Sequence, residues 1–298
     1  MTLPITHLRR IALRAVEAQA SAAFYEEVWG LTPVSTGGPD GPVALRGTGG
    51  EHHLLELHQA EINGIEHIGF GMPSADDVDR SARTLGDRGV RILQEPGELT
   101  GPGGGYGFRF ADLEGRVIEC STLVQAARPT PDGPTPKKLA HVVLNTVDID
   151  AACAWWIDMV GLRVSDWSEH QMVFLRCNDE HHCVAFNQAE HTSLNHVAYE
   201  VPSLDGYMRS LGRLKRAGHD PAWGPGRHGP GNNAFGYFID PSGLVCEVTA
   251  EVERIDEATW TPRVWPRTPE LSDLWGTAGP PSPLVRSHMA GVPDPTSL

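Results

Sequence analysis

The chain repeats itself at a distance of about 130 residues. Residues 51–61 read EHHLLELHQAE, and residues 180–190 read EHHCVAFNQAE. Each segment is followed by a histidine between apolar residues, in IEHIGF and in LNHVAY. Further matches lie upstream (FYEEVWGL with WWIDMVGL) and downstream (FADLEGRVIEC with FIDPSGLVCEV), in the same order. These ordered matches indicate two homologous halves, so the chain is expected to fold as two copies of one architecture.

The repeat divides the 298 residues into four segments. We expect an N-terminal domain over residues 1–124 and a C-terminal domain over residues 139–250. Between them, residues 125–138 carry four prolines and no apolar periodicity, which is typical of a linker. Residues 251–298 form a tail rich in Trp and Pro. Its tryptophans predict that residues 256–276 pack against the protein or a neighbouring subunit, whereas roughly the last fifteen residues are expected to be mobile.

Each half subdivides into two units with the order β-α-β-β-β. In the C-terminal half, HVVLNTV (141–147) is a β-branched run typical of a strand, and Asp148 or Asp150 can cap the helix that follows. NHVAYEV (195–201) begins the next unit, whose helix is expected at about residues 203–217. Four such units predict an α+β fold in which the mixed sheet of each half curls into an open barrel.

Composition excludes several function classes. The net charge of −14 argues against a nucleic acid or an anionic membrane surface as partner. No apolar run approaches the ~20 residues of a membrane span, and the start of the chain lacks the apolar core of a signal peptide. The five cysteines form no CxxC pair, so we expect reduced thiols and a cytoplasmic protein.

Three residues of metal-ligand type occupy matching positions in the C-terminal half. His141 begins one strand, His196 lies in the matching strand of the next unit, and Glu247 lies in that unit's final strand. If these strands are neighbours, the three side chains point into one concavity. Two imidazoles and a carboxylate leave the other positions of an octahedron open, which suits Fe(II) and oxygen chemistry, and Mn(II) accepts the same ligands. A single strand histidine is more often structural, so the three together carry this prediction.

These segments resemble the type I extradiol ring-cleaving catechol dioxygenases of the vicinal oxygen chelate superfamily, which have a glyoxalase-like fold. The resemblance rests on LAHVVLNT, CNDEHHCVAFN, LNHVAYEV, GPGRHGPGNNAFGYFIDPSG and VCEV, and it extends over residues 5–276. In that family a His-His-Glu triad holds the active metal. The resemblance therefore implies that His141, His196 and Glu247 bind Fe(II) or Mn(II).

The resemblance also implies roles for three further residues. His182 matches the family's acid–base histidine beside the oxygen site. His228 and Tyr237 match a His and a Tyr that hydrogen-bond the substrate and can accept or share the proton that a catechol loses. Ordinary alternatives stay open, since His228 lies in a Gly/Pro loop and Tyr237 could be a core residue. His181, beside the acid–base histidine, is expected at the surface.

The N-terminal half retains only part of this set. Three positions keep the residue type: His67 for His196, Glu119 for Glu247, and His53 for His182. Arg10 stands in the place of the first metal ligand, Arg109 stands in the place of the tyrosine, and no histidine matches the one in GPGRHG. A cation in place of a ligand makes a poor metal site. We interpret this half as a vestigial copy that supports the fold and the subunit interface.

The residue before GPGRHG bears on the substrate. In the homoprotocatechuate-cleaving branch of the family an Arg stands there and helps to hold the acid side arm, whereas this chain has Trp223. An aromatic surface in place of a bidentate carboxylate partner indicates a neutral alkyl-, aryl- or hydroxy-substituted catechol that contacts this residue. The resemblance thus implies extradiol cleavage of a catechol by O2 to a ring-opened semialdehyde, in a homo-oligomer of two, four or more subunits.

Two other functions stay open at this point. A glyoxalase-like metal-dependent isomerase on the same fold usually has a fourth protein ligand and a second Glu, whereas the C-terminal half offers three ligands. A non-enzymatic ligand-binding protein on this fold is expected to have lost its metal ligands, as the N-terminal half has. The retained triad favours the dioxygenase over both.

Overall fold

The four predicted units are present in the computed structural model, which describes residues 2–34 and 41–294. The first unit contains β1 (His7–Ala15), α1 (Ala18–Ala23), β2 (Thr32–Val34), β3 (Val43–Arg46) and β4 (Leu55–Gln59). The second contains β5 (Gly64–Gly71), α2 (Ala75–Asp87), β6 (Ile92–Glu98), β7 (Tyr106–Ala111) and β8 (Val117–Thr122).

The C-terminal half repeats this order. The third unit contains β9 (Lys138–Thr146), α3 (Ile149–Trp155), β10 (Arg163–Ser168), β11 (Met172–Arg176) and β12 (Val184–Gln188). The fourth contains β13 (Ser193–Glu200), α4 (Leu204–Arg216), β14 (Trp223–Arg227), β15 (Ala234–Ile239) and β16 (Val245–Ala250). The tail adds β17 (Arg263–Trp265), α5 (Pro269–Ser272) and α6 (Pro283–Ala290).

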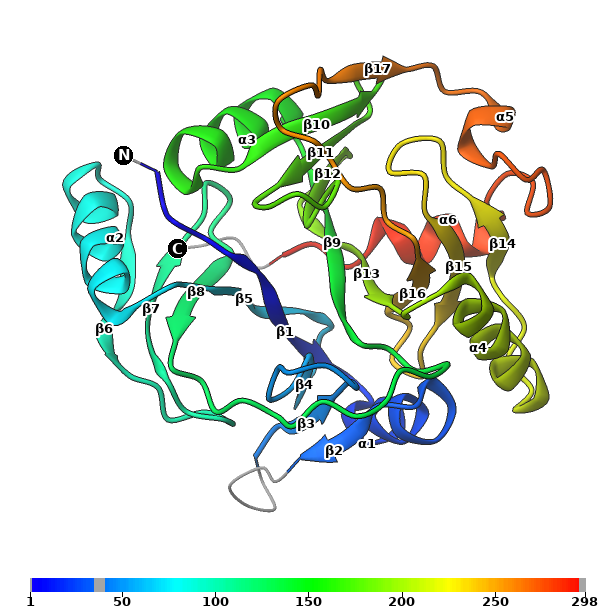
Figure 1. The fold of residues 1–298 in the computed structure, drawn as a ribbon, viewed down its shortest axis with the longest axis horizontal. Helices are drawn as coiled ribbons and strands as arrows, with labels where there is room; N and C mark the ends of the chain where they lie inside the picture. The colour runs from blue at the N-terminus through cyan, green and yellow to red at the C-terminus, as the bar shows by residue number, and fades with distance from the viewer. Residues whose placement is uncertain (1, 35–40, 295–298) are drawn as a thin grey trace.

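Each half forms one mixed sheet, as predicted (Figure 1). The strand orders are β2-β3-β4-β1-β5-β8-β7-β6 and β14-β15-β16-β13-β9-β12-β11-β10-β17. In both sheets the first strands of the two units are antiparallel neighbours at the centre, and the last strand of each unit runs parallel to its own first strand. This pairing brings the strands that carry the candidate ligands together.

Local signals start and end the helices of the C-terminal half. The Asp148 carboxylate accepts a hydrogen bond from the backbone N of Ala151 at 3.0 Å, so Asp148 rather than Asp150 caps α3. Helices α1 and α3 each continue into a π-helical turn, η1 (Phe24–Trp29) and η2 (Trp156–Val160). Glycine closes both turns in the left-handed region, with φ +90° at Gly161, where a residue with a Cβ would be strained.

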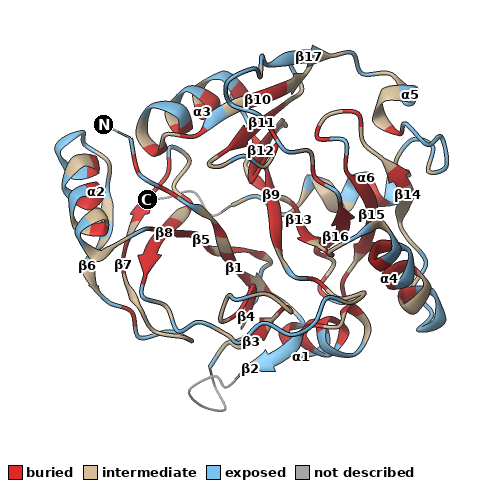
Figure 2. Ribbon diagram, in the orientation of Figure 1, coloured by how far each residue is buried: buried red, intermediate tan, exposed pale blue. Residues whose placement is uncertain are grey.

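The two halves share one hydrophobic core. Trp29, at the end of η1, packs edge-on against Phe238 of the other half, with ring centroids 5.6 Å apart. Trp156 makes the equivalent contact with Phe70 at 6.1 Å. Both tryptophans are fully buried. Figure 2 shows that the central strands of both sheets are buried over most of their length, while the edge strands β2 and β17 and the outer faces of the helices are exposed. Each half therefore stabilises the other by burying its apolar surface.

Polar contacts from two equivalent turns also join the halves. In the turn before β8, the buried Arg116 donates to the backbone carbonyl of Asn145 at 2.6 Å and pairs with Asp294 at 2.8 Å. In the matching turn before β16, the backbone carbonyl of Ser242 accepts from the side chain of Asn63 at 2.6 Å. The N-terminal half therefore reaches the strand that carries the first candidate ligand.

The predicted linker contains no helix or strand before β9 begins. It lies along the loop after β3, where Thr130 donates from its backbone N to the carbonyl of Thr48 at 3.0 Å. Thr48 in turn donates from its backbone N to the carbonyl of Pro136 at 2.9 Å. The connection is thus hydrogen-bonded to the N-terminal half.

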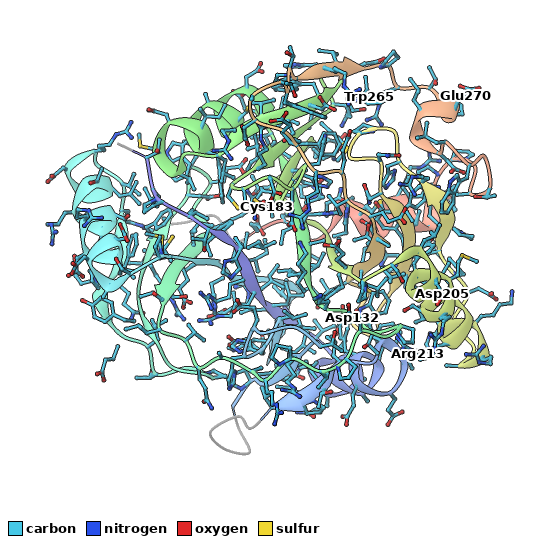
Figure 3. The ribbon with its side chains drawn as sticks, in the orientation of Figure 1. Asp132, Cys183, Asp205, Arg213, Trp265 and Glu270 are labelled. Carbon is cyan, nitrogen blue, oxygen red and sulfur yellow. The ribbon has the colours of Figure 1, made fainter. Side chains whose placement is uncertain are left out.

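Residues 256–276 of the tail pack against the C-terminal half, which confirms that part of the prediction. Strand β17 adds a parallel edge strand to β10, and Figure 3 shows Trp265 in this segment. Trp265 donates from Nε1 to a carboxylate oxygen of Asp166 at 2.7 Å, and Trp260 donates to the carbonyl of Ser165 at 2.8 Å.

The end of the tail differs from the expectation. Helix α6 packs on β13 and β16, and Val285 is fully buried there. The prediction of a mobile end is wrong for this helix, because its apolar face closes over the sheet. Residues 295–298 lie outside the described residues. Within the described chain, none of the helices has the length and apolar character needed to cross a membrane.

We expect Arg116→Met to lower the free energy of unfolding by about 3 kcal/mol, because it leaves the buried carboxylate of Asp112 and the partly buried carboxylate of Glu114 without their cation. Urea unfolding at neutral pH measures the loss. The exposed Arg80, which pairs with the partly buried Asp77, provides the control, and Arg80→Met should cost less than about 1 kcal/mol. Equal losses in the two variants would contradict the assignment.

Candidate metal centre and active site

The register of three neighbouring strands places the predicted ligands on one face of the second sheet. His141 in β9 lies opposite Ala198 in β13, and Ala198 lies opposite Glu247 in β16. His196 is two residues before Ala198, so its side chain points to the same face. The alanine between the ligands leaves open the space into which their side chains extend.

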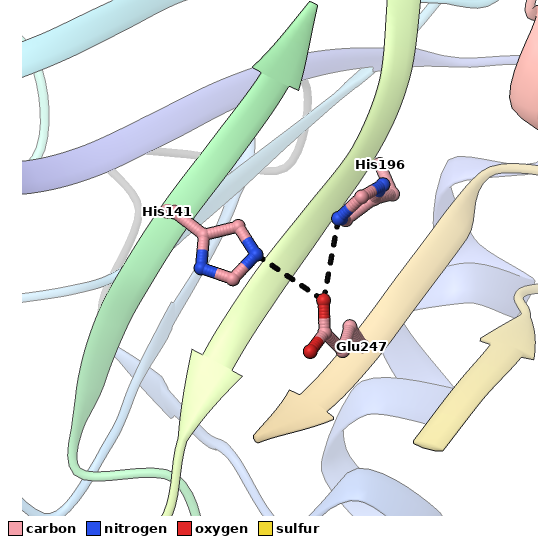
Figure 4. A group of neighbouring side chains, drawn as sticks. All are labelled: His141, His196 and Glu247. Atoms are coloured by element: carbon pink, nitrogen blue, oxygen red, sulfur yellow. Dashed lines mark hydrogen bonds and ion pairs between the residues drawn. The ribbon is translucent and has the colours of Figure 1, made fainter. Parts of the chain in front are cut away.

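The three side chains converge (Figure 4). One carboxylate oxygen of Glu247 lies 3.2 Å from Nε2 of His141 and 3.2 Å from Nε2 of His196. All three ligand atoms lie within 4.8 Å of one another, and the residues are buried. Among the described residues, Nε2 of His196 has no hydrogen-bond partner although it is buried. A divalent cation between these atoms would satisfy it, so the triad fits a metal.

Electrostatics favour the ligand forms of these residues. Burial alone would raise the pKa of the Glu247 carboxyl, but the two imidazoles outweigh it and hold that pKa well below its usual range. Burial lowers the pKa of His196, so its imidazole is neutral at physiological pH. A carboxylate and neutral imidazoles are the forms that bind metals.

A chain of amides fixes the tautomer of His196. The side-chain N of Asn145 donates to the backbone carbonyl of Met289 at 2.8 Å, so the other end of that amide must accept. It accepts from Asn195 at 3.0 Å, and the carbonyl end of Asn195 accepts from Nδ1 of His196 at 2.8 Å. His196 therefore carries its hydrogen on Nδ1, and its Nε2 is free for a metal. The chain begins at α6 of the tail.

His228 and Tyr237 form a hydrogen-bonded pair beside the triad. His228 donates from Nδ1 to the carbonyl of Ser272 at 3.2 Å, and its Nε2 lies 3.0 Å from the Tyr237 hydroxyl. Desolvation lowers the pKa of His228 to about 4, so its Nε2 is bare and accepts the tyrosine hydrogen. Burial raises the pKa of Tyr237 well above its usual range. The Tyr237 ring lies 5.0 Å from the ring of His196.

His182 lies on the other side of the triad, with its ring centroid 4.2 Å from that of His141. Burial and the neighbouring imidazoles hold the pKa of His182 well below its usual range. The expectation that His181 is exposed is wrong, because this residue is fully buried under the tail. Its ring packs edge-on against Trp260 of the tail at 5.9 Å.

One cavity of about 500 Å³ connects these groups. Six of the seven predicted site residues line it, namely His141, His182, His196, Trp223, His228 and Tyr237. Trp223 stacks on Tyr237 at 5.0 Å and forms part of one wall. The tail forms the outer wall through β17, α5 and α6, which contribute Trp265, Leu271, Arg286 and Met289. Glu247, the seventh predicted residue, is fully buried and does not line the cavity.

The N-terminal half has the same register with different side chains. Arg10 lies opposite Gly69, and Gly69 lies opposite Glu119. These three positions match those of His141, Ala198 and Glu247 in the C-terminal half. Arg10 hydrogen-bonds the buried Glu119 carboxylate directly, and Arg109 pairs with it at 2.9 Å. Burial lowers the pKa of the neighbouring His67 to about 4. Two guanidinium groups thus compensate the charge that a metal would compensate in the other half.

Sequence reasoning gave no role to Asn145, Asn195 or His181. The two asparagines lie within the quoted motifs, and the matching positions of the N-terminal half carry Arg14 and Glu66. Both asparagines are polar residues in central strands, and their residue type differs from that at the matching position of the other half. That difference is the signal that could have singled them out. For His181 no such signal exists, because His52 occupies the matching position.

Comparison with known proteins identifies the family. The family model described as Glyoxalase/Bleomycin resistance protein/Dioxygenase superfamily matches residues 7–120 and 138–248. The chain belongs to this superfamily. The predicted glyoxalase-like fold is thereby confirmed, and the superfamily includes the dioxygenases that the sequence motifs resemble.

Relatives of the chain include a metapyrocatechase and a manganese-dependent dioxygenase. Metapyrocatechase 2 of Cupriavidus necator is 31% identical over 133 residues, which cover 44% of this chain and 40% of that protein. The manganese-dependent 2,3-dihydroxybiphenyl 1,2-dioxygenase of Geobacillus genomosp. 3 is 26% identical over 294 residues, covering 89% of this chain and 91% of that protein. The Mn(II)-bound glyoxalase of Novosphingobium aromaticivorans has a similar structure, with a TM-score of 0.88, 37% identity and coverage of 94% and 93%.

We expect Asn195→Leu to weaken metal binding by about 10- to 100-fold, because the Nδ1 hydrogen of His196 loses its acceptor. Asn195→Asp keeps an acceptor for the Nδ1 hydrogen but loses the N–H that Asn145 accepts, so its affinity should lie between those of the leucine variant and the wild type. Competition with a chelator measures both affinities for Mn(II). Unchanged affinity in the leucine variant would show that the amide chain does not fix the ligand.

The buried His67 predicts a loss of stability in acid. The unfolded chain takes up a proton at its ordinary pKa, whereas folded His67 resists protonation down to about pH 4, so the free energy of unfolding falls as pH drops through this interval. His67→Leu should shrink the stability difference between pH 7 and pH 5 by about 2 kcal/mol. Denaturant titrations at both pH values measure it. His170→Leu, at an exposed histidine, should leave the difference unchanged.

Proposed function

We propose that the protein is a metal-dependent extradiol dioxygenase, which opens the ring of a catechol beside its two hydroxyl groups and incorporates both atoms of O2. One observation carries this proposal. A single cavity holds two histidines of the triad on its wall, with His182 on one side of them and the Tyr237–His228 pair on the other. Extradiol cleavage needs two vicinal oxygens to approach one metal, and it needs groups beside them that move protons.

Tyr237 and His228 would remove the proton of a catechol hydroxyl. The tyrosine hydrogen points to Nε2 of His228, so the lone pairs of the phenol oxygen are free to accept a hydrogen bond from the substrate. A proton that reaches this oxygen can pass on to His228. The carbonyl of Ser272 holds the imidazole in the orientation that this transfer needs.

His182 would serve the other side of the substrate. It is neutral at rest because burial and nearby imidazoles disfavour its cation. A neutral imidazole can accept a proton from the second hydroxyl and return it as negative charge develops on oxygen. His182 is almost fully buried, and charge interactions are stronger in such a low-dielectric environment than in water.

Fe(II) or Mn(II), held by His141, His196 and Glu247, would supply a template for both substrate oxygens and O2 and the redox chemistry that the side chains lack. Several relatives are named for ring cleavage of catechols, and one of them is named as manganese-dependent. These names support the proposal, as does the fit of the triad to a divalent cation.

A neutral substituted catechol fits the cavity best. Its lining is largely apolar beyond the triad and includes Val143, Met172, Phe174, Trp223, Leu271 and Met289. Charged residues lie toward the exposed rim, where Glu190 accompanies Arg267 and Arg286. An alkyl or aryl substituent would pack against this lining. The homo-oligomeric assembly and the cytoplasmic location stay predictions.

An isomerase of glyoxalase type is the second candidate, because a structure with 37% identity carries that name. Its chemistry needs no oxygen. In this chain the triad offers three ligands, and Ala185 occupies the position where the N-terminal half has Glu56. The absence of a second glutamate at that position favours the dioxygenase.

Oxygen uptake by Fe(II)- or Mn(II)-loaded protein, with a panel of neutral catechols, tests the proposal. We expect one O2 consumed per catechol and a yellow ring-opened product. His182→Phe should lower kcat by about 10²- to 10⁴-fold through the lost proton transfer. His170→Ala, at an exposed histidine of the same half, should match the wild type. Absence of uptake from protein that holds one metal per chain would favour the isomerase.

A further inference from the structure

Three buried residues form a line that leads from the tail to the active site. Asp166 in β10 lies 3.2 Å from Nε2 of His181, measured at its carboxylate oxygen Oδ2. Nδ1 of His181 lies 3.0 Å from Nδ1 of His182. Asp166 and His181 are fully buried, and His182 is 3% exposed. Only His182 reaches the cavity, so the other two could act on the substrate only through it.

The carboxylate of Asp166, at the end of the line, determines where each hydrogen lies. Burial alone would raise the pKa of Asp166, but hydrogen bonds from His181, from the backbone N of Arg263 and from Trp265 outweigh it and leave that pKa below its usual value. Asp166 is therefore a carboxylate, and it can only accept. Nε2 of His181 must then carry a hydrogen.

The second hydrogen follows from the first. With its hydrogen on Nε2, neutral His181 has a bare Nδ1, which can only accept. The hydrogen between the two Nδ1 atoms therefore belongs to His182. A neutral His182 with its hydrogen on Nδ1 has a lone pair on Nε2, which is the form that a proton acceptor needs.

We propose that Asp166 and His181 are positioning residues, which hold His182 in the tautomer whose Nε2 is a proton acceptor. The importance of this tautomer for catalysis rests on the proposed function, whereas its existence does not. A carboxylate that fixes the tautomer of a catalytic imidazole can affect the rate by orders of magnitude.

Packing prevents the line from rearranging. Phe174 lies against both imidazoles, with ring centroids 5.7 Å from His181 and 5.1 Å from His182. The tail fixes the carboxylate, because Trp265 donates to Oδ2 at 2.7 Å and the backbone N of Arg263 donates to Oδ1 at 2.7 Å. The tail thus orients the acid as well as covering the cavity.

The N-terminal half contains the same histidine pair with the acid at the opposite end. Nδ1 of His52 lies 2.9 Å from Nδ1 of His53, as in the active half. Here the carboxylate of Glu56 lies 2.7 Å from Nε2 of His53, the residue that matches His182. By the same reasoning His53 carries its hydrogen on Nε2 and has no acceptor there. The two histidine pairs therefore differ in which histidine the carboxylate contacts: the first, His181, in the C-terminal half, and the second, His53, in the N-terminal half.

Neutron diffraction of the deuterium-exchanged, Mn(II)-loaded protein tests the hydrogen positions directly. We expect deuterium on Nε2 of His181 and on Nδ1 of His182, and none on Nε2 of His182. Deuterium on Nε2 of His182 would overturn the proposal. This measurement stands whether or not the protein cleaves catechols, so it separates a failure of this inference from a failure of the proposed function.

Kinetics of three variants test the consequence. His181→Phe removes the acceptor and should lower kcat by about 10- to 100-fold, with metal content, melting temperature and KM for the catechol near those of the wild type. His181→Gln offers an amide oxygen to His182 and an amide N–H to Asp166, so it should recover much of the loss. His52→Phe is the matched control and should keep the wild-type kcat.

Two kinetic outcomes would contradict the positioning role. One is a kcat for His181→Phe close to that of the wild type. The other is a glutamine variant as slow as the phenylalanine variant, since a role in packing alone would not depend on a donor and an acceptor. A third result would also indicate a packing role: His181→Phe and His181→Gln lose the same amount of kcat, and both melt at an equally lowered temperature.

Discussion

The structure depends on the pairing register of β9, β13 and β16. It aligns His141, Ala198 and Glu247 in one row across the sheet, and it puts His196 on the same face. Because side chains alternate along a strand, a shift of one residue would turn the whole set to the other face. The N-terminal sheet keeps the same row as Arg10, Gly69 and Glu119. There the buried carboxylate of Glu119 is paired with arginine, which closes the site. In the C-terminal sheet two imidazoles adjoin the carboxylate of Glu247, and the three side chains offer ligand atoms to a cation.

The N-terminal half, which has arginines in place of a metal site, still supports the candidate ligands of the C-terminal half. Its Arg116 holds the backbone of Asn145, and the side chain of that asparagine begins the chain of amides that ends at His196. The same asparagine holds the end of α6. The core and the turns of the N-terminal half therefore support the candidate ligands of the C-terminal half.

The tail covers the cavity, and it also fixes polar groups that lead to His196 and His182. Helix α6 and the segment around β17 form the outer wall of the cavity. The first polar line ends in the tail, at the carbonyl of Met289. The second ends at Asp166 of β10, whose carboxylate accepts hydrogen bonds from Arg263 and Trp265 of the tail. A buried group that can only accept fixes the direction of the hydrogen bonds that lead to it. Here the tail supplies one such group, the carbonyl of Met289, and orients the other, the carboxylate of Asp166.

The sequence by itself determined the repeat, the β-α-β-β-β units, a helix cap at Asp148 or Asp150, and the residues of the triad. Those features depend on local periodicity, on capping chemistry and on ligand types at repeated positions. Only the tertiary structure revealed the roles of Asn145, Asn195 and Asp166, because such polar residues acquire partners through strand register and through docking of the tail. Helix α6 escaped prediction for the same reason: it has only eight residues, it follows a proline-rich segment, and the surface that buries Val285 is formed by strands more than 30 residues away.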